Sequence, residues 1–244
     1  MLNDSERLDD LQLDGLKIIQ DKNKYNFTSD SALLANFVST KKNDDCVEIG
    51  CGSGVISILV NHKCNPKKIY AFEIQKSMAE LAKRNIELNN LNEKIDVINA
   101  PIQEFENYLS KSSIDVVFSN PPYMKTNDKS LVNCNEEKAI SRHELKLNLQ
   151  ELIMCSSQLL KFGGRLFLVH RSERLFEIFQ EMNRFNLQPK KMFFVSSSVD
   201  KNPNIVLIEA QKGAKPGLKV LPTLIVNDKY GNYLYTIQKL YKGE

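Results

Sequence analysis

The 244-residue chain is 42% hydrophobic and carries 33 basic against 30 acidic residues, a formal net charge of +3. This length suits one α/β domain with a small extension, and so small a charge neither requires nor excludes a nucleic-acid partner. The five cysteines form no CxxC pair and mostly lie in apolar runs, so we expect reduced thiols and no metal site.

The sequence predicts a single domain over residues 1–244, in which residues 1–44 form an amino-terminal lead-in. The first ten residues, MLNDSERLDD, are acidic where a signal peptide would be basic, and no apolar run reaches the ~20 residues that a membrane span needs. We therefore expect a cytoplasmic protein with no membrane partner. Apolar periodicity in SALLANFV predicts a helix, which either merely covers the core or brings Phe27 and Thr28 over a ligand.

The stretch DCVEIGCGSGVISILVN predicts a strand, a glycine-rich loop and a helix, and it begins the catalytic core, expected over residues 45–210. Closely spaced glycines let the backbone approach a ligand, and unpaired NH groups at the helix start suit a carboxylate. Glu48, at the strand end, is an acid that could bind an amino group. The expected loop residues are Gly50, Cys51, Gly52, Ser53 and Gly54.

The next two strands add acceptors at the same sheet edge. KKIYAFEI ends at Glu73, from where a carboxylate can accept both hydroxyls of a ribose, so an adenosine moiety is indicated. Ile74 follows it directly. The third strand, KIDVINA, ends at Asn99 and Ala100. We place all four residues at a nucleotide-type ligand.

The fourth strand, in SIDVVFSNPPY, stops at two prolines and brings an amide and an aromatic ring to its carboxyl end. The Asn120 side-chain carbonyl and the Pro121 main-chain carbonyl can together accept both hydrogens of an exocyclic amine and free its lone pair. Tyr123 offers a flat face on which a base can stack. These three residues are the predicted catalytic group.

Beyond this site the sequence predicts a loop over residues 124–144 and a further βα repeat. Arg142 and His143 in the loop either contact a phosphate or base, or pair with Glu144 and solvent. The repeat comprises a helix in LQELIMCSSQLLK, a turn at Gly163–Gly164 and the strand RLFLVH. KMFFVSSS and NIVLIEA then predict a closing antiparallel pair of strands.

Residues 211–244 form a basic, tyrosine-rich C-terminal extension. Its interleaved lysines and tyrosines could meet the phosphates and unstacked bases of RNA. A hairpin that turns near residues 227–232 and docks on the domain edge is an equally good interpretation.

Together, VEIGCGSG, Glu73 and NPPY resemble the class I S-adenosylmethionine-dependent methyltransferases. The NPPY form resembles the enzymes that methylate planar amide or exocyclic nitrogens. The lead-in, the RHE at 142–144 and KGAKPGLKVLPTLIV are similar to the bacterial family that methylates N6 of the adenosine 3′ of the anticodon in a valine tRNA. The resemblance covers nearly the full chain.

This resemblance implies a Rossmann-like fold with a seven-stranded, mostly parallel sheet and an antiparallel edge strand. It also implies S-adenosylmethionine as cofactor, the anticodon loop of a tRNA as partner, and a monomer or weak dimer. Relatives usually carry an acid after the third strand for the cofactor's adenine amine; here Asn99, Ala100 and Pro101 stand there instead. The expected cofactor residues are Phe27, Thr28, Glu48, Gly50, Cys51, Gly52, Gly54, Glu73, Ile74, Asn99, Ala100 and Asn120.

Three alternatives stay open. Glutamine methylation of peptide release factors uses a similar NPPY, but those enzymes place a helical substrate domain ahead of the glycine loop, where this sequence has only residues 1–47. DNA adenine methylation shares the chemistry but needs a region that reads the target sequence. A non-catalytic RNA-binding module would not need the intact Asn120 and Tyr123.

Overall fold

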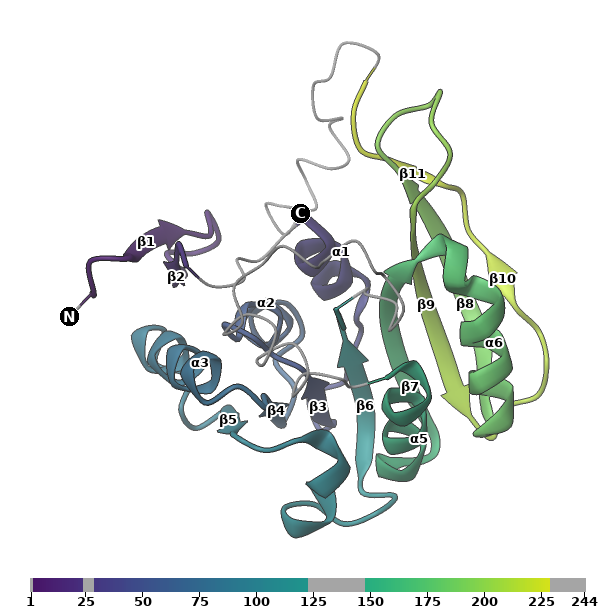
Figure 1. Ribbon diagram of the computed structural model, residues 1–244. Coiled ribbons are helices and arrows are strands. Elements are labelled where there is room, and N and C mark those ends of the chain that lie inside the picture. Colours follow the sequence, from purple (N-terminus) through teal and green to yellow (C-terminus); the bar gives the residue numbers. More distant parts are fainter. Residues whose placement is uncertain (1, 24–28, 123–147, 229–244) are drawn as a thin grey trace, which may run out of the picture.

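The computed structural model describes residues 2–23, 29–122 and 148–228 (Figure 1). The predicted Phe27, Thr28, Tyr123, Arg142 and His143 therefore lie outside the described residues. The first elements in chain order are β1 (Glu6–Asp10), β2 (Lys17–Asp21), α1 (Ser29–Phe37), β3 (Asp45–Ile49), α2 (Val55–Cys64), β4 (Lys68–Phe72), α3 (Lys76–Leu88), β5 (Ile95–Ile98), the 3₁₀ helix η1 (Ile102–Asn107) and β6 (Ile114–Ser119).

The second half of the chain completes the sheet and one of its faces. Its elements are α5 (Leu149–Leu159), β7 (Leu160–Arg171), the 3₁₀ turn η3 (Ser172–Arg174), α6 (Leu175–Arg184), β8 (Leu187–Ser196), β9 (Ile205–Lys212), β10 (Lys219–Val220) and β11 (Leu224–Ile225). α5 begins with a capping box, in which the Asn148 side chain accepts from the Glu151 backbone NH at 2.8 Å.

The main sheet confirms the predicted mostly parallel architecture with an antiparallel edge. Its described strands lie in the order β10-β8-β9-β7-β6-β3-β4-β5, and β11 also pairs with β8. β9 runs antiparallel to both of its neighbours, β7 and β8. The reversed strand of the predicted closing pair is therefore β9, which lies between β7 and β8 rather than outside them. Two tail strands, β10 and β11, pair parallel with β8 and extend the edge.

The sheet is buried on both faces, which explains the nearly continuous apolar runs of its central strands. Along β3, Cys46 packs with the apolar residues of α1, α2 and α3, whereas its neighbour Val47 packs with those of η1, α5 and α6. Three layers result, with helices on either side of the sheet (Figure 1). From β3 the chain proceeds to β4 and β5 in one direction, and then from β6 to β7 in the other. Open α/β sheets bind ligands at such a switch point.

One local prediction is wrong. The sequence predicts a turn at Gly163–Gly164, but both glycines lie inside the continuous strand β7. The register against β6 shifts between Ile114 and Val116, and Gly163 adopts a φ of 79°. A Cβ on Gly164 would lie 2.9 Å from the Lys161 carbonyl oxygen, so the strand passes too close to itself for a larger residue.

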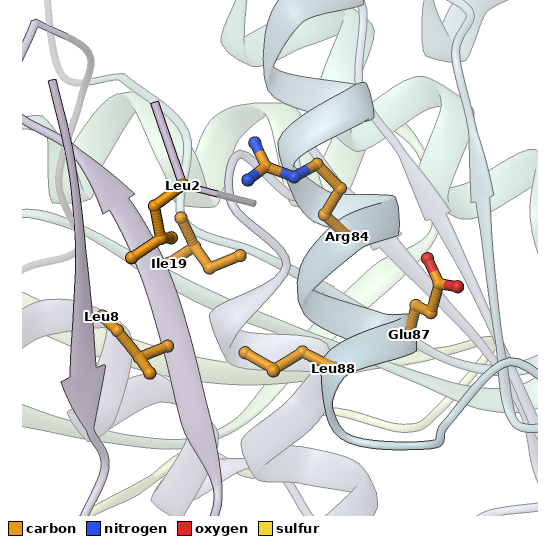
Figure 2. Close-up of a pocket in the computed structure, with 6 residues that line it drawn as sticks. All are labelled: Leu2, Leu8, Ile19, Arg84, Glu87 and Leu88. Atoms are coloured by element: carbon orange, nitrogen blue, oxygen red, sulfur yellow. The ribbon is translucent and has the colours of Figure 1, made fainter. Parts of the chain in front are cut away.

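The lead-in forms a β1–β2 hairpin that docks on α3. Asn85 on α3 binds both the NH and the carbonyl of Ile19, at 2.7 and 3.1 Å, and Asn89 binds the NH and carbonyl of Lys17. Arg84 makes a bidentate ion pair with Glu6 of β1. Below this pair, Leu8, Ile19 and Leu88 line an apolar hollow of about 420 Å³ (Figure 2). None of its lining residues belongs to the predicted site.

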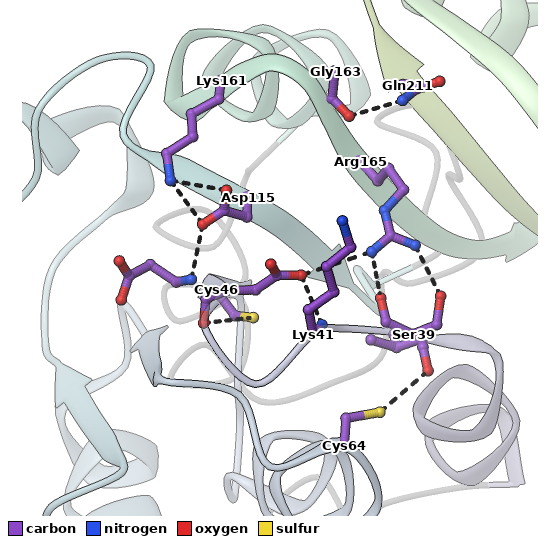
Figure 3. Close-up of polar contacts among 12 residues, drawn as sticks. Ser39, Lys41, Cys46, Cys64, Asp115, Lys161, Gly163, Arg165 and Gln211 are labelled. Atoms are coloured by element: carbon purple, nitrogen blue, oxygen red, sulfur yellow. Dashed lines mark hydrogen bonds and ion pairs between the residues drawn. The ribbon is translucent and has the colours of Figure 1, made fainter.

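A cluster of polar side chains lies at the amino-terminal ends of the central strands (Figure 3). Lys161 contacts both carboxylate oxygens of Asp115 at 2.8 Å, and Asp115 in turn accepts from the Asp45 backbone NH at 3.0 Å. Arg165 donates to the hydroxyl and the carbonyl of Ser39 at 2.9 Å. These contacts tie β3, β6, β7 and the end of the lead-in together at the edge opposite Asn120.

Candidate functional site

The glycine loop after β3 has the backbone that a close ligand approach requires. Gly50, Gly52 and Gly54 have φ values of 73°, 55° and 82°, where side chains are strained. Nothing lies within 4 Å of a Cβ built on Gly50, whereas one on Gly54 would lie 3.4 Å from the Ala82 Cβ. Gly50 thus borders open space, and Gly54 lets α2 pack closely against α3.

Cys51 in this loop is not a reactive thiol. It is buried, and burial raises its pKa well above the ordinary value, with the nearby acids Glu48 and Glu73 adding to the shift. A neutral buried thiol is a small apolar group, so Cys51 serves packing within the loop.

Glu48 is fully buried at the end of β3. Its Oε2 accepts from the backbone NH of Ser57 at 3.0 Å and from the Ser57 hydroxyl, whereas its Oε1 has no hydrogen-bond partner within the described part of the chain. Burial raises the pKa of Glu48 to about 8, and the bonds from Ser57 counteract only part of that effect. One carboxylate oxygen is therefore held by α2, and the other is left for a donor.

Glu73 shapes the loop from the neighbouring strand. Its two carboxylate oxygens accept from the backbone NH groups of Gly52 and Gln75, each at 2.9 Å. Burial raises its pKa, against the effect of these bonds. Each oxygen keeps further lone-pair capacity, so Glu73 can hold the glycine loop and a hydroxyl-bearing ligand at the same time.

Asn99 is exposed, and its amide nitrogen bonds to the backbone after β4. Its Nδ2 donates to the carbonyls of Glu73 and Ile74 at 2.8 and 3.1 Å, which fixes the turn that follows β4. Ile74 stays 42% exposed, and Ala100 is buried. The edge of β4 and β5 thus combines a braced turn with an exposed apolar side chain.

Asn120 and Pro121 follow β6, next to the end of β3. Ile49 pairs with Ser119, whose hydroxyl also donates to the Ile49 carbonyl at 2.8 Å. The amide nitrogen of Asn120 donates to the hydroxyl of Ser31 on α1 at 3.3 Å. The sheet thereby brings the start of NPPY and the glycine loop to one edge.

Most of the predicted site residues that the structure describes share this edge, at the ends of β3, β4, β5 and β6. Three side chains that brace them do not stand out in the sequence: Ser31, Ser57 and Asn85. Ser57 has a usable signal, because it follows the glycine loop on the first turn of a helix. The roles of Asn85 and Ser31 can be recognised only in the structure, because their partners lie far away in the sequence. Asn85 also donates to the Ser53 carbonyl at 2.9 Å, which links α3 to the loop.

Two absences hold for the described residues. Among them, no group of three or more His, Cys, Asp or Glu side chains could hold a metal ion. Over the same residues, no helix has both the length and the apolar character that crossing a bilayer requires.

Two curated proteins illustrate what the sequence is similar to. A tRNA1(Val) (adenine(37)-N6)-methyltransferase from Porphyromonas gingivalis is 27% identical over 77% of this chain and 74% of its own length. A putative protein N5-glutamine methyltransferase from Methanocaldococcus jannaschii is 35% identical, but over only 50% of this chain and 59% of its own length.

Solved structures match the fold. A predicted O-methyltransferase from Agrobacterium tumefaciens superimposes with a TM-score of 0.70 at 20% identity, over 87% of this chain and 95% of its own. M. jannaschii TYW2 in complex with AdoMet gives a TM-score of 0.60 at 16% identity, over 86% and 87% of the two chains. The family model for the methyltransferase small domain matches residues 24–188. The chain therefore belongs to the methyltransferase small domain family.

Proposed function

We propose that the protein transfers a methyl group from S-adenosylmethionine to N6 of an adenosine in tRNA, the one 3′ of the anticodon in a valine tRNA. The observation that carries this proposal is the placement of Asn120 and Pro121 beside the glycine loop, fixed by the pairing of Ser119 with Ile49. The similarity to the tRNA1(Val) methyltransferase of P. gingivalis supports the choice of substrate.

The residues at this edge fit S-adenosylmethionine. Gly50 leaves room for a ligand against the backbone, and the Glu48 Oε1, which has no hydrogen-bond partner among the described residues, is an acceptor for an amino group. Glu73 would accept from the ribose hydroxyls, and Ile74 with Ala100 would flank the adenine. When bound, the cofactor supplies an electrophilic methyl group on a sulfonium.

The chain's own contribution is to hold and polarise the amine. The lone pair of an adenine N6 is delocalised into the ring. Acceptors at the Asn120 Oδ1 and the Pro121 carbonyl would bind its two hydrogens, favour a tetrahedral nitrogen and stabilise the positive charge that develops there. Stacking of the extruded base on Tyr123 would complete the placement. The methylated nitrogen is acidic while cationic and loses its proton to solvent, so no dedicated base is required.

Glutamine N5 methylation is the second candidate, because the M. jannaschii relative carries that name at 35% identity. A side-chain amide is also a planar nitrogen, and the same two acceptors would hold it. That similarity covers 50% of this chain, against 77% for the tRNA methyltransferase, so we favour the nucleic-acid substrate.

Nucleoside analysis separates the two candidates. The purified protein is incubated with labelled S-adenosylmethionine and either transcribed tRNAs or a peptide release factor. We expect label in N6-methyladenosine of a valine tRNA transcript, and none when adenosine 37 is replaced by guanosine. Label in glutamine of the release factor, with none in RNA, would replace the proposal by the second candidate.

A further inference from the structure

Asn99 lies beside Glu73, at the carboxyl ends of two neighbouring strands. β4 and β5 run parallel and pair Phe72 with Ile98, so the residues that follow them are level with each other (Figure 1). The Asn99 side chain crosses to β4, where its Nδ2 donates to the carbonyls of Glu73 and Ile74 at 2.8 and 3.1 Å. Asn99 nevertheless stays exposed. Its amide is therefore held at the ligand edge by the backbone of the adjacent turn.

The two partners fix which end of the Asn99 amide faces the turn. A carbonyl oxygen only accepts hydrogen bonds, so the nitrogen, which carries two donors, has to face both carbonyls. The reversed amide would place three acceptor oxygens against one another. Oδ1 consequently points away from the turn, and it accepts no hydrogen bond from any residue that the structure describes.

Neighbouring acceptors at the end of β5 are already engaged. The Ile98 carbonyl accepts from the backbone NH groups of Glu73 and Ala100 at 3.0 and 3.1 Å, and the Pro101 carbonyl accepts from the Glu104 NH at 3.0 Å. The side chains of Ala100 and Pro101 carry no polar atom. Oδ1 of Asn99 is thus the side-chain acceptor that residues 99–101 offer to a ligand.

We propose that Oδ1 of Asn99 accepts a hydrogen bond from the exocyclic amine of the cofactor's adenine and makes the site selective for adenine over a 6-oxo purine. This inference rests on the proposed cofactor. With the ribose on Glu73 and the ring against the exposed Ile74, the amino edge of the base is directed toward the end of β5. A 6-oxo purine would instead turn an acceptor toward Oδ1, and the two oxygens would repel each other.

The test compares two ligands that differ at this one position. Calorimetry measures the binding of S-adenosylhomocysteine and of S-inosylhomocysteine, in which an oxygen replaces the amine. We expect the wild type to bind the adenosyl compound at least about tenfold more tightly, because the inosyl compound loses a hydrogen bond and gains a repulsion. In Asn99→Ala this ratio should fall to roughly two or less. Damage to the turn would weaken both ligands alike, so the ratio reports recognition.

Two further variants separate the oxygen from the brace. Asn99→Asp loses both bonds to the turn, because a carboxylate has no donor, but it keeps an oxygen for the amine and should retain most of the ratio. Asn89→Ala is the matched control. The Asn89 Nδ2 also donates to two carbonyls, those of Lys17 and Asn85 at 2.8 and 2.7 Å, but its Oδ1 already accepts from the Lys17 NH at 3.0 Å. This variant should leave both affinities unchanged.

The outcomes separate this inference from the proposed function. A wild type that binds neither compound would overturn the proposed cofactor and this inference with it. A wild type that binds both compounds equally well would overturn the role of Asn99 alone, as would an Asn99→Ala variant that keeps the wild-type ratio. Equal losses of the ratio in Asn99→Ala and Asn99→Asp would also overturn it, because the braced turn and not the oxygen would then be responsible.

Discussion

Individual carboxylates are central to the proposed cofactor site. Glu73 bonds to the glycine loop and is also proposed to bind the ligand. Glu73→Ala removes the acceptor for the Gly52 and Gln75 NH groups together with the proposed ribose acceptor. We expect S-adenosylmethionine binding to weaken by about 1.5–3 kcal/mol, with tRNA affinity nearly intact. Calorimetry on both ligands measures this. Equal cofactor affinity in the variant and the parent would remove Glu73 from the site.

Glu48 makes a prediction about pH. Burial raises its pKa from 4.5 to about 8, so the folded chain binds a proton more tightly than the unfolded chain does. The contribution of Glu48 to stability is therefore greatest below pH 4.5 and declines as the pH rises toward 8. The Glu48→Gln variant has no carboxyl to ionise at this position. As the pH rises from 4.5 toward 8, its free energy of unfolding should therefore increase relative to that of the wild type, by on the order of 2–4 kcal/mol.

Urea unfolding of the ligand-free protein at pH 5 and pH 8 checks this expectation. Other titrating groups are shared by the two proteins, so the difference between their free energies of unfolding isolates Glu48. A difference that stays constant between the two pH values would show that the buried carboxyl ionises as easily as in the unfolded chain.

At the scale of elements, α3 couples the β1–β2 hairpin to the glycine loop through one side chain. Asn85 binds Ile19 on the hairpin and Ser53 in the loop, and it is fully buried. Asn85→Ala leaves three backbone groups without that partner, and we expect a loss of about 2–4 kcal/mol in the free energy of unfolding. Cofactor affinity should fall as well, because Ser53 lies inside the loop.

Asn89→Ala is the control for this coupling. Asn89 holds Lys17 of the same hairpin by its NH and carbonyl, but its side chain makes no hydrogen bond to the loop residues that the structure describes. We expect faster hydrogen exchange in β2 for both variants and weaker cofactor binding for Asn85→Ala alone. If both variants bind the cofactor equally well, the hairpin and the loop are independent.

For the molecule as a whole, the sequence predicts the sheet well because its strands are apolar runs that end in glycines, prolines or acids. The edge that carries Glu48, Glu73 and Asn120 follows from strand order alone. The strand through Gly163–Gly164 was missed because two glycines favour a turn locally. At these glycines β7 shifts its register against β6, and its pairing with β9 begins only at Arg165. Ser31 and Asn85 were missed because their partners lie 89 and 66 residues away.

One part of the C-terminal extension packs on the sheet, and the remainder is proposed to bind RNA. Lys219–Val220 and Leu224–Ile225 pair with β8, and Lys212 donates to the carbonyls of Ser157 and Leu160 at 2.6 and 2.7 Å. These residues belong to the sheet edge, so a test on RNA should spare them. Truncation after residue 228 removes three lysines and four tyrosines: Lys229, Lys239, Lys242, Tyr230, Tyr233, Tyr235 and Tyr241.

We expect this truncation to weaken tRNA binding and to flatten its dependence on salt, because fewer counterions are released on contact. Cofactor affinity and the urea midpoint should barely change. Filter binding at several salt concentrations provides the measurement. An unaltered salt slope in a folded variant would assign these residues to packing.

The central claim is that Asn120 holds the attacking amine, and Asn120→Ala in single-turnover methylation tests it most directly. Saturating enzyme and cofactor isolate the chemical step, and calorimetry on the same variant reports cofactor binding. We expect the rate to fall by roughly a hundredfold or more while the cofactor dissociation constant changes little, because the lost acceptor acts on charge that develops only during transfer. A wild-type rate for Asn120→Ala would contradict the account.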